Sequence, residues 1–333
     1  MTYSSGGLIQ ATDYNGFADT TVGANVNATW GTGVTSAGYG QTAISTVSVA
    51  GTVTATQWAT LVNNIASMGS HQGTAITART APVTGNTISI LSAVNTDITN
   101  CYNNRGNAAA SGSQFTGYTG TNSKTGATSG AAWSITFTNT VTFASANAAR
   151  YFFNAGGTIK IDVSKTSTGA TGDPEWNDLA NTLCGDIFIT GGAYSQTIAG
   201  VVYTGTTKSG GTGTPTTLTT TTGFFDLTPG GAAVIVYKQF ADTAPYTANF
   251  IQHSLSLDAG STVLTITTLW SAGDSGPGNP DPITGGTAAS GATPGTAPCT
   301  IVTYFPPSST YLSASWGTPS VAATTVSKRG RCP

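Results

Sequence analysis

The chain has 333 residues, with 11 Lys and Arg, 13 Asp and Glu, and a formal net charge of -2. Charged residues make up 7% of it, whereas an ordinary soluble domain has roughly a quarter. Binding a phosphate backbone needs several Lys or Arg side chains together, so we expect no nucleic-acid partner. No apolar run approaches the roughly 20 residues that span a bilayer, and the first ten residues lack the charged and apolar parts of a signal peptide. We therefore expect neither membrane insertion nor a secretion signal.

Hydroxyl groups take the place of charge on the expected surface. The sequence has 64 threonines and 43 glycines, but a single glutamate, Glu175. Hydroxyl groups keep a surface hydrated, yet they provide little electrostatic repulsion between copies. This composition favours a protein that packs side by side with other chains.

Residues 1–108 have the pattern of a small helical region that attaches the protein to a larger particle. Predicted helices lie at residues 14–22, 58–68 and 88–101, where apolar residues recur at spacings of three and four. Thr54 and Gln57 fit a capping box at the start of the second helix. Helices this short are marginal in isolation, so we expect their apolar faces to pack on each other or on neighbouring subunits.

Residues 109–131 are mostly Gly, Ser, Thr and Asn, and we expect a linker or a long surface loop there. Residues 132–204 follow as a central α+β unit of the strand, helix, strand type, because apolar and polar residues alternate before and after a helical stretch. Its expected elements are a hairpin at 133–143, a helix capped by Ser145, a strand at 159–163, a helix at 175–184 and a strand at 187–189.

Residues 205–333 are expected to form a β-rich domain with long Gly/Pro loops and a C-terminal tail. Predicted strands lie at 234–237, 246–257, 263–270, 301–304 and 311–316. Regular short strands separated by turn residues favour an antiparallel sandwich. The expected fold class is therefore α+β, mainly β, with a small helical N-terminal region, a central strand-helix-strand unit and a C-terminal antiparallel β-sandwich-like region.

Candidate catalytic residues are scarce. The only histidines, His71 and His253, lie outside any nucleophile motif such as GxSxG, and we interpret both as hydrogen-bonded structural residues. Asp173, Glu175 and Asp178 are close in sequence, and we interpret them as favourable charges near a helix N-terminus. A general acid/base pair or a calcium site is the alternative for these acids. We expect no enzyme activity, no catalytic residue, no metal and no cofactor.

The cysteines are far apart and form no CxxC pair, which argues against zinc. Cys101 and Cys184 fall on predicted helices, where a buried free thiol is the usual state. Cys332 lies among basic residues near the chain end, so a bridge to Cys299 or to another subunit is an alternative to free thiols. We expect the end of the chain from Lys328 onward to anchor to a neighbouring chain, with a solvated, mobile end as the alternative.

Aromatic residues are the candidates for assembly contacts. They are Trp58, Tyr151, Phe152 and Phe153. For the run Tyr151 to Phe153 we favour a place in the core, and an exposed docking face is the alternative.

Several short motifs follow one another along the chain. They are IQATDYN at 9–15, GYGQ at 38–41, TATQW at 54–58, HQG at 71–73, ARYFFNAGG at 149–157 with TIKI after it, and YTANF at 246–250. In this order they resemble virion structural proteins of tailed bacteriophages, notably tail-associated proteins of contractile-tailed phages. The resemblance covers about half of the chain, and the Thr/Gly insertions and the Cys-bearing tail depart from the family pattern.

The resemblance implies a virion component, assembled in the host cytoplasm, and it brings no catalytic residues. Its implied partners are further copies of itself and other virion structural proteins, with a host surface receptor as a further candidate. The leading hypothesis is a non-enzymatic tail protein of a fibre, baseplate or neck collar. The alternative is a receptor- or carbohydrate-binding β module, in which Trp270, Tyr311 or Trp316 would stack on sugars. A depolymerase is disfavoured by the shortage of acids.

Overall fold

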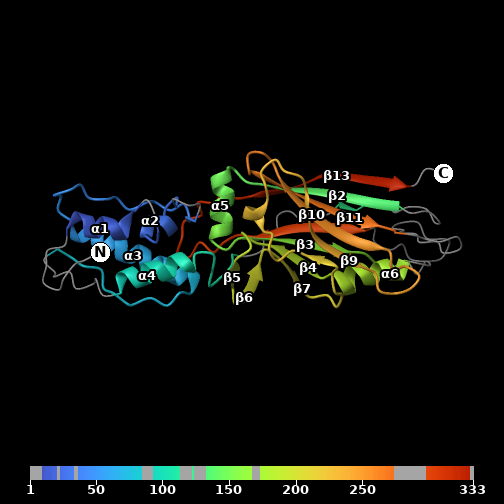
Figure 1. Ribbon diagram of the computed structural model, residues 1–333, viewed down its shortest axis with the longest axis horizontal. Coiled ribbons are helices and arrows are strands. Elements are labelled where there is room, and N and C mark those ends of the chain that lie inside the picture. Colours follow the sequence, from blue (N-terminus) through green and yellow to red (C-terminus); the bar gives the residue numbers. More distant parts are fainter. Residues whose placement is uncertain are drawn as a thin grey trace.

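The computed structural model describes residues 10–20, 23–33, 37–84, 93–112, 122–123, 133–166, 173–273 and 298–330. These residues form a long body with helices at one end and antiparallel sheets at the other (Figure 1). The fold is α+β and mainly β, which confirms the expected class.

The described residues between positions 10 and 112 form a helical lobe. Its helices are α1 (Ala11–Ala18), α2 (Val26–Thr29), α3 (Ala55–Gln72) and α4 (Val94–Asn103). The predicted capping box starts α3: the backbone N–H of Gln57 donates to Oγ1 of Thr54 at 3.2 Å, and the N–H of Thr54 donates to Oε1 of Gln57 at 2.8 Å. The helix ends where Gly73 adopts a left-handed conformation, with a φ of 70°.

The apolar faces of these helices pack on each other within one chain. Trp58 of α3 is fully buried, and the rings of Tyr14 and Phe17 of α1 lie 5.5 and 6.1 Å from it. Ile98 and Cys101 of α4 join the same core. Of the two alternatives for these faces, packing inside the chain is therefore the one observed.

A six-stranded antiparallel sheet forms one layer of the sheet region. In spatial order its strands are β13 (Ser320–Gly330), β2 (Trp133–Thr142), β11 (Val263–Ser271), β10 (Phe250–Leu257), β9 (Val234–Phe240) and β8 (Thr217–Leu218). The hairpin predicted at 133–143 is wrong, because β2 is one continuous strand. Asn139 stays in the strand since it has a ladder partner on each side, Ile266 in β11 and Ala323 in β13.

A five-stranded antiparallel sheet forms the other layer. Its order is β1 (Asn122–Ser123), β12 (Cys299–Phe305), β3 (Thr158–Ser164), β4 (Asp186–Ile189) and β7 (Thr206–Ser209), and a separate hairpin consists of β5 (Ser195–Ile198) and β6 (Val201–Thr204). The predicted alternation is confirmed in β3, where Ile159, Ile161 and Val163 are buried.

Helices connect the layers. In α5 (Ala146–Asn154), Oγ of Ser145 accepts from the N–H of Ala148 at 3.0 Å, as the sequence predicted. Gly156, with a φ of 87°, then lets the chain turn into β3. The helix predicted at 175–184 is present as α6 (Asp173–Asp178) and the π-helix η1 (Leu179–Cys184).

The predicted domain boundary between residues 204 and 205 does not divide the structure. β2 and β3 precede it, yet β2 pairs with β11 and β13, and β3 pairs with β12. One apolar core includes residues of both segments and of the helical lobe. The separate central and C-terminal domains are therefore wrong, because strands from each segment complete the sheets of the other.

The helical lobe is tied to the sheets by specific hydrogen bonds. The amide of Asn154, at the end of α5, donates to the carbonyl oxygen of Gly38 at 3.0 Å. The N–H of Gly112 donates to the carbonyl oxygen of Pro306 at 2.8 Å, so the described start of the predicted linker lies on the body. Within residues 113–131, the structure describes only 122–123. The linker prediction for the other positions in that range lies outside the described residues.

The strand predicted at 311–316 is also wrong. Leu312 and Trp316 are buried there, but the backbone bonds to a side chain of the helical lobe and to no strand among the described residues. Oε1 of Gln41 accepts from the N–H of Ser313 at 2.8 Å, and Nε2 of Gln41 donates to the carbonyl oxygen of Ser313 at 2.9 Å. Leu312 and Trp316 are thus buried at this lobe junction and not in a sheet.

Candidate functional site

Both histidines lie in the interior. Nε2 of His71, on α3, donates to the carbonyl oxygen of Ala155 at 3.1 Å, and Nδ1 of His253, on β10, lies 2.9 Å from Oγ1 of Thr268. Burial lowers the pKa of His71 to about 4 and that of His253 to about 3. Each imidazole is thus neutral near pH 7, and its described partner is a structural group.

The described thiols are buried. Burial raises the pKa of Cys101, on α4, and of Cys184, at the end of η1, to about 12. The pKa of Cys299, the first residue of β12, is also raised by burial. These thiols therefore stay protonated near pH 7. Cys332 lies outside the described residues, so its pairing with Cys299 and the anchoring role of the chain end stay predictions.

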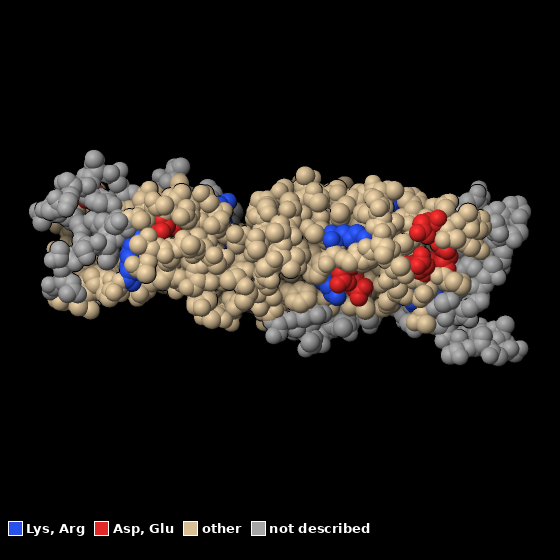
Figure 2. Space-filling model, turned by 90° about the horizontal axis from the view of Figure 1, so that it is seen from below, with Lys and Arg blue, Asp and Glu red and all other residues tan. Residues whose placement is uncertain are grey.

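An acidic cluster lies at the sheet end of the body. Glu175 and Asp178 of α6 meet Asp242, which follows β9, and carboxylate oxygens of the three lie within 4.8 Å of one another. Figure 2 shows acidic side chains gathered near the end where α6 lies. This spacing suits a shared cation, but Asp242 is exposed, and such groups are common without an ion. The side chain of Asp173 is not described, so two members of the predicted trio are placed here.

We expect Glu175→Gln to raise the midpoint of thermal unfolding at pH 7. Burial raises the pKa of Glu175, and the charges of Asp178 and Asp242 raise it further. A carboxyl group whose pKa is higher in the folded than in the unfolded state destabilises the fold when it is ionised. Glutamine removes the charge at similar size, and the gain should vanish near pH 3, where the group is protonated in both states.

Asp258→Asn is the matched control for this prediction. Hydrogen bonds from the backbone of Val263 and from Thr262 lower the pKa of Asp258, so its charge stabilises the fold. The asparagine variant should therefore have a lower midpoint at pH 7. A midpoint of Glu175→Gln equal to or below that of the wild type would contradict the expected repulsion in the cluster.

The aromatic residues predicted as assembly-contact candidates lie inside the chain. Trp58, Phe152 and Phe153 are fully buried, and Tyr151 is 8% exposed. Phe153 stacks on Phe224 with ring centroids 4.5 Å apart. The place in the core that we favoured is observed, and the assignment of these side chains as a docking face is wrong because other side chains of the same chain cover them.

The aromatic residues considered for sugar stacking do not form one surface. Trp270 is fully buried, with its ring 5.9 Å from that of Trp176, and Trp316 is also buried. Tyr311 is exposed. The assignment of Trp270 and Trp316 to sugar binding is therefore wrong, because neither presents a ring face to solvent.

An exposed apolar surface lies instead on the hairpin of β5 and β6. The chain reverses at Ala199 and Gly200, whose φ angles of 50° and 82° suit a two-residue turn. Val201 is 48% exposed and Val202 is 60% exposed. The hairpin projects from the middle of the body, close to where the helices meet the sheets (Figure 1). The middle of the face seen from below carries no coloured charged side chain (Figure 2).

Half-buried aromatic rings line a groove of about 130 Å³ beside the hairpin. They are Phe188 of β4, Tyr203 of β6 and Phe305 of β12, and the ring of Phe188 lies 5.3 Å from that of Tyr203 and 6.3 Å from that of Phe305. The other lining residues are Ser111, Thr158, Ile198, Ala199 and Val201. We call Phe188, Val201, Tyr203 and Phe305 the hairpin surface. Val202 follows Val201 in β6, so its side chain is exposed on the opposite face of the strand.

The helical lobe holds the hairpin in place. The buried amide of Gln196 donates to the carbonyl oxygen of Gly106 at 2.8 Å. The N–H of Ala108 donates to the carbonyl oxygen of Thr197, and the N–H of Ala199 donates to that of Ala108, both at 2.9 Å. A surface on a fixed support loses little conformational entropy when a partner binds.

Sequence reasoning missed the hairpin surface. The available signal is the pair Val201 and Val202, directly after an Ala-Gly turn, where a half-buried strand would alternate apolar with polar residues. The contribution of Phe188 and Phe305 has no local signal, because β4 and β12 belong to another sheet and meet β6 only in the folded chain.

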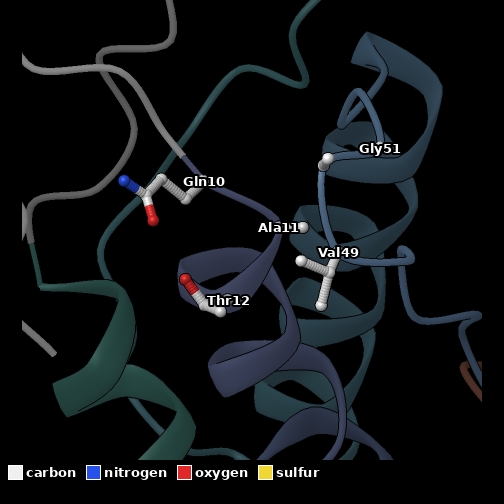
Figure 3. Close-up of a pocket in the computed structure, with 6 residues that line it drawn as sticks. Gln10, Ala11, Thr12, Val49 and Gly51 are labelled. Carbon is white, nitrogen blue, oxygen red and sulfur yellow. The ribbon is translucent and has the colours of Figure 1, made fainter.

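A second hollow, of about 190 Å³, lies in the helical lobe. Gln10, Ala11 and Thr12 at the start of α1 line one side, and residues 49–51, from the loop before α3, line the other (Figure 3). Val49 is 87% exposed. The lining side chains are uncharged, so this hollow has no group for acid or base chemistry.

Comparison of the chain with protein-family models, with curated proteins and with solved structures finds no match. Among the described residues, the helices are too short or too polar to cross a membrane. The relationship to virion proteins therefore stays a prediction from the sequence motifs.

Proposed function

We propose that the chain is a non-enzymatic structural component of a tailed-phage virion, associated with the tail, and that it assembles in multiple copies. The observation that carries this proposal is the hairpin surface, where the exposed Val201 lies beside an aromatic groove on a fixed support, and Val202 is exposed on the other face of the same hairpin. Exposed apolar patches of this kind are typical of protein–protein contacts. A net charge of -2 on 333 residues adds little repulsion between copies.

The expected strength of one contact suits assembly in many copies. Complete burial of a valine side chain contributes about 1.5 to 3 kcal/mol, and Val201 and Val202 are each partly covered already in the single chain. One such contact is weak enough for the free chain to stay dispersed. Many contacts made together hold a particle firmly, because each later contact forms within an assembly.

The buried titratable groups support a structural function. His71 and His253 are neutral near pH 7 and bonded to groups of the chain itself. The thiols of Cys101 and Cys184 are protonated because burial raises their pKa. Nucleophilic or acid/base catalysis needs such groups near the operating pH and within reach of a substrate.

A receptor- or carbohydrate-binding module is the second candidate, and the aromatic groove is the feature that favours it. Small-molecule sites are usually about 300 to 1,000 Å³ in volume, whereas this groove has about 130 Å³. Its polar side chains are those of Ser111, Thr158 and Tyr203, too few to orient a sugar by several hydrogen bonds. The groove thus suits an apolar side chain of a partner protein better than a sugar.

We expect the double variant Val201→Thr, Val202→Thr to weaken self-association about tenfold or more, which corresponds to about 1.4 kcal/mol. Threonine keeps the β-branched shape that suits a strand but replaces a methyl group by a hydroxyl group. Sedimentation velocity over a concentration series measures the change. Val49→Thr is the matched control, because Val49 is exposed in the helical lobe, away from the hairpin surface.

Equal loss of association in the double variant and in Val49→Thr would contradict the role of the hairpin surface. Electron microscopy of the purified particle tests the wider proposal. It should show the chain in the tail with the hairpin surface covered by a neighbour. A chain found only as a free monomer, outside the particle, would overturn the proposal.

A further inference from the structure

Tyr194 lies where the helical lobe meets the sheets, directly before β5, and its ring rests among three glycines. A β-carbon at Gly191 would lie 2.7 Å from the phenol oxygen, and one at Gly106 would lie 2.7 Å from Cε2 of the ring. A β-carbon at Gly192 would lie 3.1 Å from Cε1, on the opposite edge. Contacts this close leave no room for a side chain at Gly191 or Gly106. Glycines from both parts of the molecule therefore form a seat for the ring.

The hydroxyl end of Tyr194 points into this seat, whereas the ring is open to solvent. Burial raises the pKa of Tyr194 to about 12, yet the residue is 42% exposed. Both observations hold because the phenol oxygen lies against the buried Gly191, while part of the ring does not. Each edge of the ring faces a glycine, so the exposed part is a face of the ring. The chain thus presents a flat aromatic face in a fixed position.

An acidic group stands beside this face. Asp226 is exposed and ends the 3-10 helix η2 (Phe224–Asp226). A β-carbon at Gly192, which would contact the ring of Tyr194, would also lie 3.4 Å from Oδ2 of Asp226. Oδ2 accepts from the N–H of Gly223 at 2.8 Å, which holds the carboxylate in place. No described residue donates to Oδ1, so this oxygen is available as an acceptor.

A basic group stands on the side of the helical lobe. Arg105, next to Gly106, is half-buried, and its guanidinium lies 4.5 Å from the centre of the Tyr102 ring. Nη1 of Arg105 donates to the carbonyl oxygen of Tyr102 at 2.7 Å, which holds the side chain in place. After the effect of burial, the charge of Arg105 lowers the pKa of Tyr194 and that of Asp226 raises it, so both charges lie close to the ring. The two flanking charges are opposite and leave the site without net charge.

We propose that Tyr194, Asp226 and Arg105 form a binding site for a neutral β-linked pyranose sugar of the glucose or galactose type, and we call these residues the tyrosine platform. Such sugars have a face of C–H groups, because most of their hydroxyl groups are equatorial, and this face stacks on an aromatic ring. Their hydroxyl groups radiate from the edge of the sugar ring, where a carboxylate accepts hydrogen bonds and a guanidinium donates them. The groove of the hairpin surface has no such pair among its lining residues.

Other ligands match the tyrosine platform less well. A charged sugar or a phosphate would be attracted by one flanking group and repelled by the other. A protein partner typically receives a tyrosine in a pocket of its own surface, whereas Tyr194 is seated in its own chain with the hydroxyl group inward. The flat exposed face suits a ligand that lies on it.

This inference goes beyond the proposed structural function, because the free chain needs no assembly to bind a sugar. One ring face without a deep cavity supports a dissociation constant on the order of 1 mM for a monosaccharide. Many copies in one particle would hold a polysaccharide more firmly, since several sites engage it together. That gain rests on the proposed function, whereas binding by a single chain does not.

Saturation-transfer NMR of the full chain, with methyl β-D-galactopyranoside and methyl β-D-glucopyranoside as probes, tests the inference. At least one probe should bind with a dissociation constant on the order of 1 mM. It should receive saturation most strongly at the C–H groups of one ring face, and binding of neither probe would overturn the proposal. The Val201→Thr, Val202→Thr variant should bind as the wild type does, which separates this test from assembly through the hairpin surface.

Replacement of the ring provides a second measurement. Tyr194→Leu fills the seat without an aromatic face and should weaken binding about tenfold or more, whereas Tyr194→Phe should stay within about twofold of the wild type. Tyr311→Leu is the matched control, because Tyr311 is also an exposed tyrosine, at 48%. A change in affinity for Tyr194→Leu no larger than that for Tyr311→Leu, or for Tyr194→Phe, would contradict stacking on this ring.

Asp226→Asn decides the matter if the unfolding midpoint shows that Tyr194→Leu does not fold. Asparagine keeps an oxygen that can accept from the N–H of Gly223, but it removes the charge that strengthens a hydrogen bond from a sugar hydroxyl group. Binding should weaken about threefold or more. Unchanged binding by a folded Asp226→Asn variant would overturn the proposal.

Discussion

At pH 4 the free energy of unfolding is expected to be lower than at pH 7 by about 3 kcal/mol for each histidine. Burial lowers the pKa of His71 to about 4 and that of His253 to about 3, whereas a histidine in an unfolded chain titrates near 6.5. Below pH 6.5 the unfolded chain therefore takes up protons that the folded chain does not. The contribution of the neutral imidazoles to the free energy of unfolding is complete above pH 6.5. It is lost as the pH falls toward the pKa of each histidine in the folded state.

Urea unfolding at several values between pH 7 and pH 4 measures this loss. The double variant His71→Gln, His253→Gln should depend much less on pH over that interval, even if it is less stable than the wild type at pH 7. Glutamine at position 71 keeps an N–H donor for the carbonyl oxygen of Ala155. Equal pH dependence of the wild type and the variant would contradict the neutral state of the buried imidazoles.

Phe153→Ala is expected to lower the free energy of unfolding by about 3 to 5 kcal/mol. Phe153 is fully buried on α5, the helix between the helical lobe and the sheets. Its ring lies 5.9 Å from that of Phe143, 5.1 Å from that of Phe152 and 4.5 Å from that of Phe224. Alanine would leave a cavity among these rings, which cannot all move to fill it. Denaturant unfolding at pH 7 measures the loss.

Phe225→Ala is the matched control. Phe225 is in the same aromatic cluster, with its ring 6.1 Å from that of Phe153, but it is 38% exposed. Solvent can fill part of the space that its ring leaves, so the loss should be clearly smaller, about 1 to 2 kcal/mol. A loss for Phe153→Ala no larger than that for Phe225→Ala would show that the cluster is not the tightly packed centre described here.

Neither the acidic cluster nor the hairpin surface could be predicted as a whole. Glu175 and Asp178 share a helix and were visible as a pair, but Asp242 joins them only because the end of β9 lies beside α6. The hairpin surface depends in the same way on Phe188 and Phe305 from two other strands. A local pattern of apolar and polar residues does not show which separate segments of the chain lie close together in the fold.

The sequence by itself determined the local elements. The capping box of Thr54 and Gln57, the Ser145 cap and the alternation of β3 depend on residues a few positions apart, so local geometry decides them. The α+β class, mainly β, followed from these elements.

Only the tertiary structure decided how the strands pair. A period of two tells which face of a strand is buried, but it does not tell which strand lies next to it. The sequence pattern therefore predicts a hairpin where β2 is a single strand. β2 lies between β11 and β13, and both of these strands are more than a hundred residues away from it in sequence. The ladder hydrogen bonds and the shared core between these distant segments make one fold of what the sequence divides into separate units.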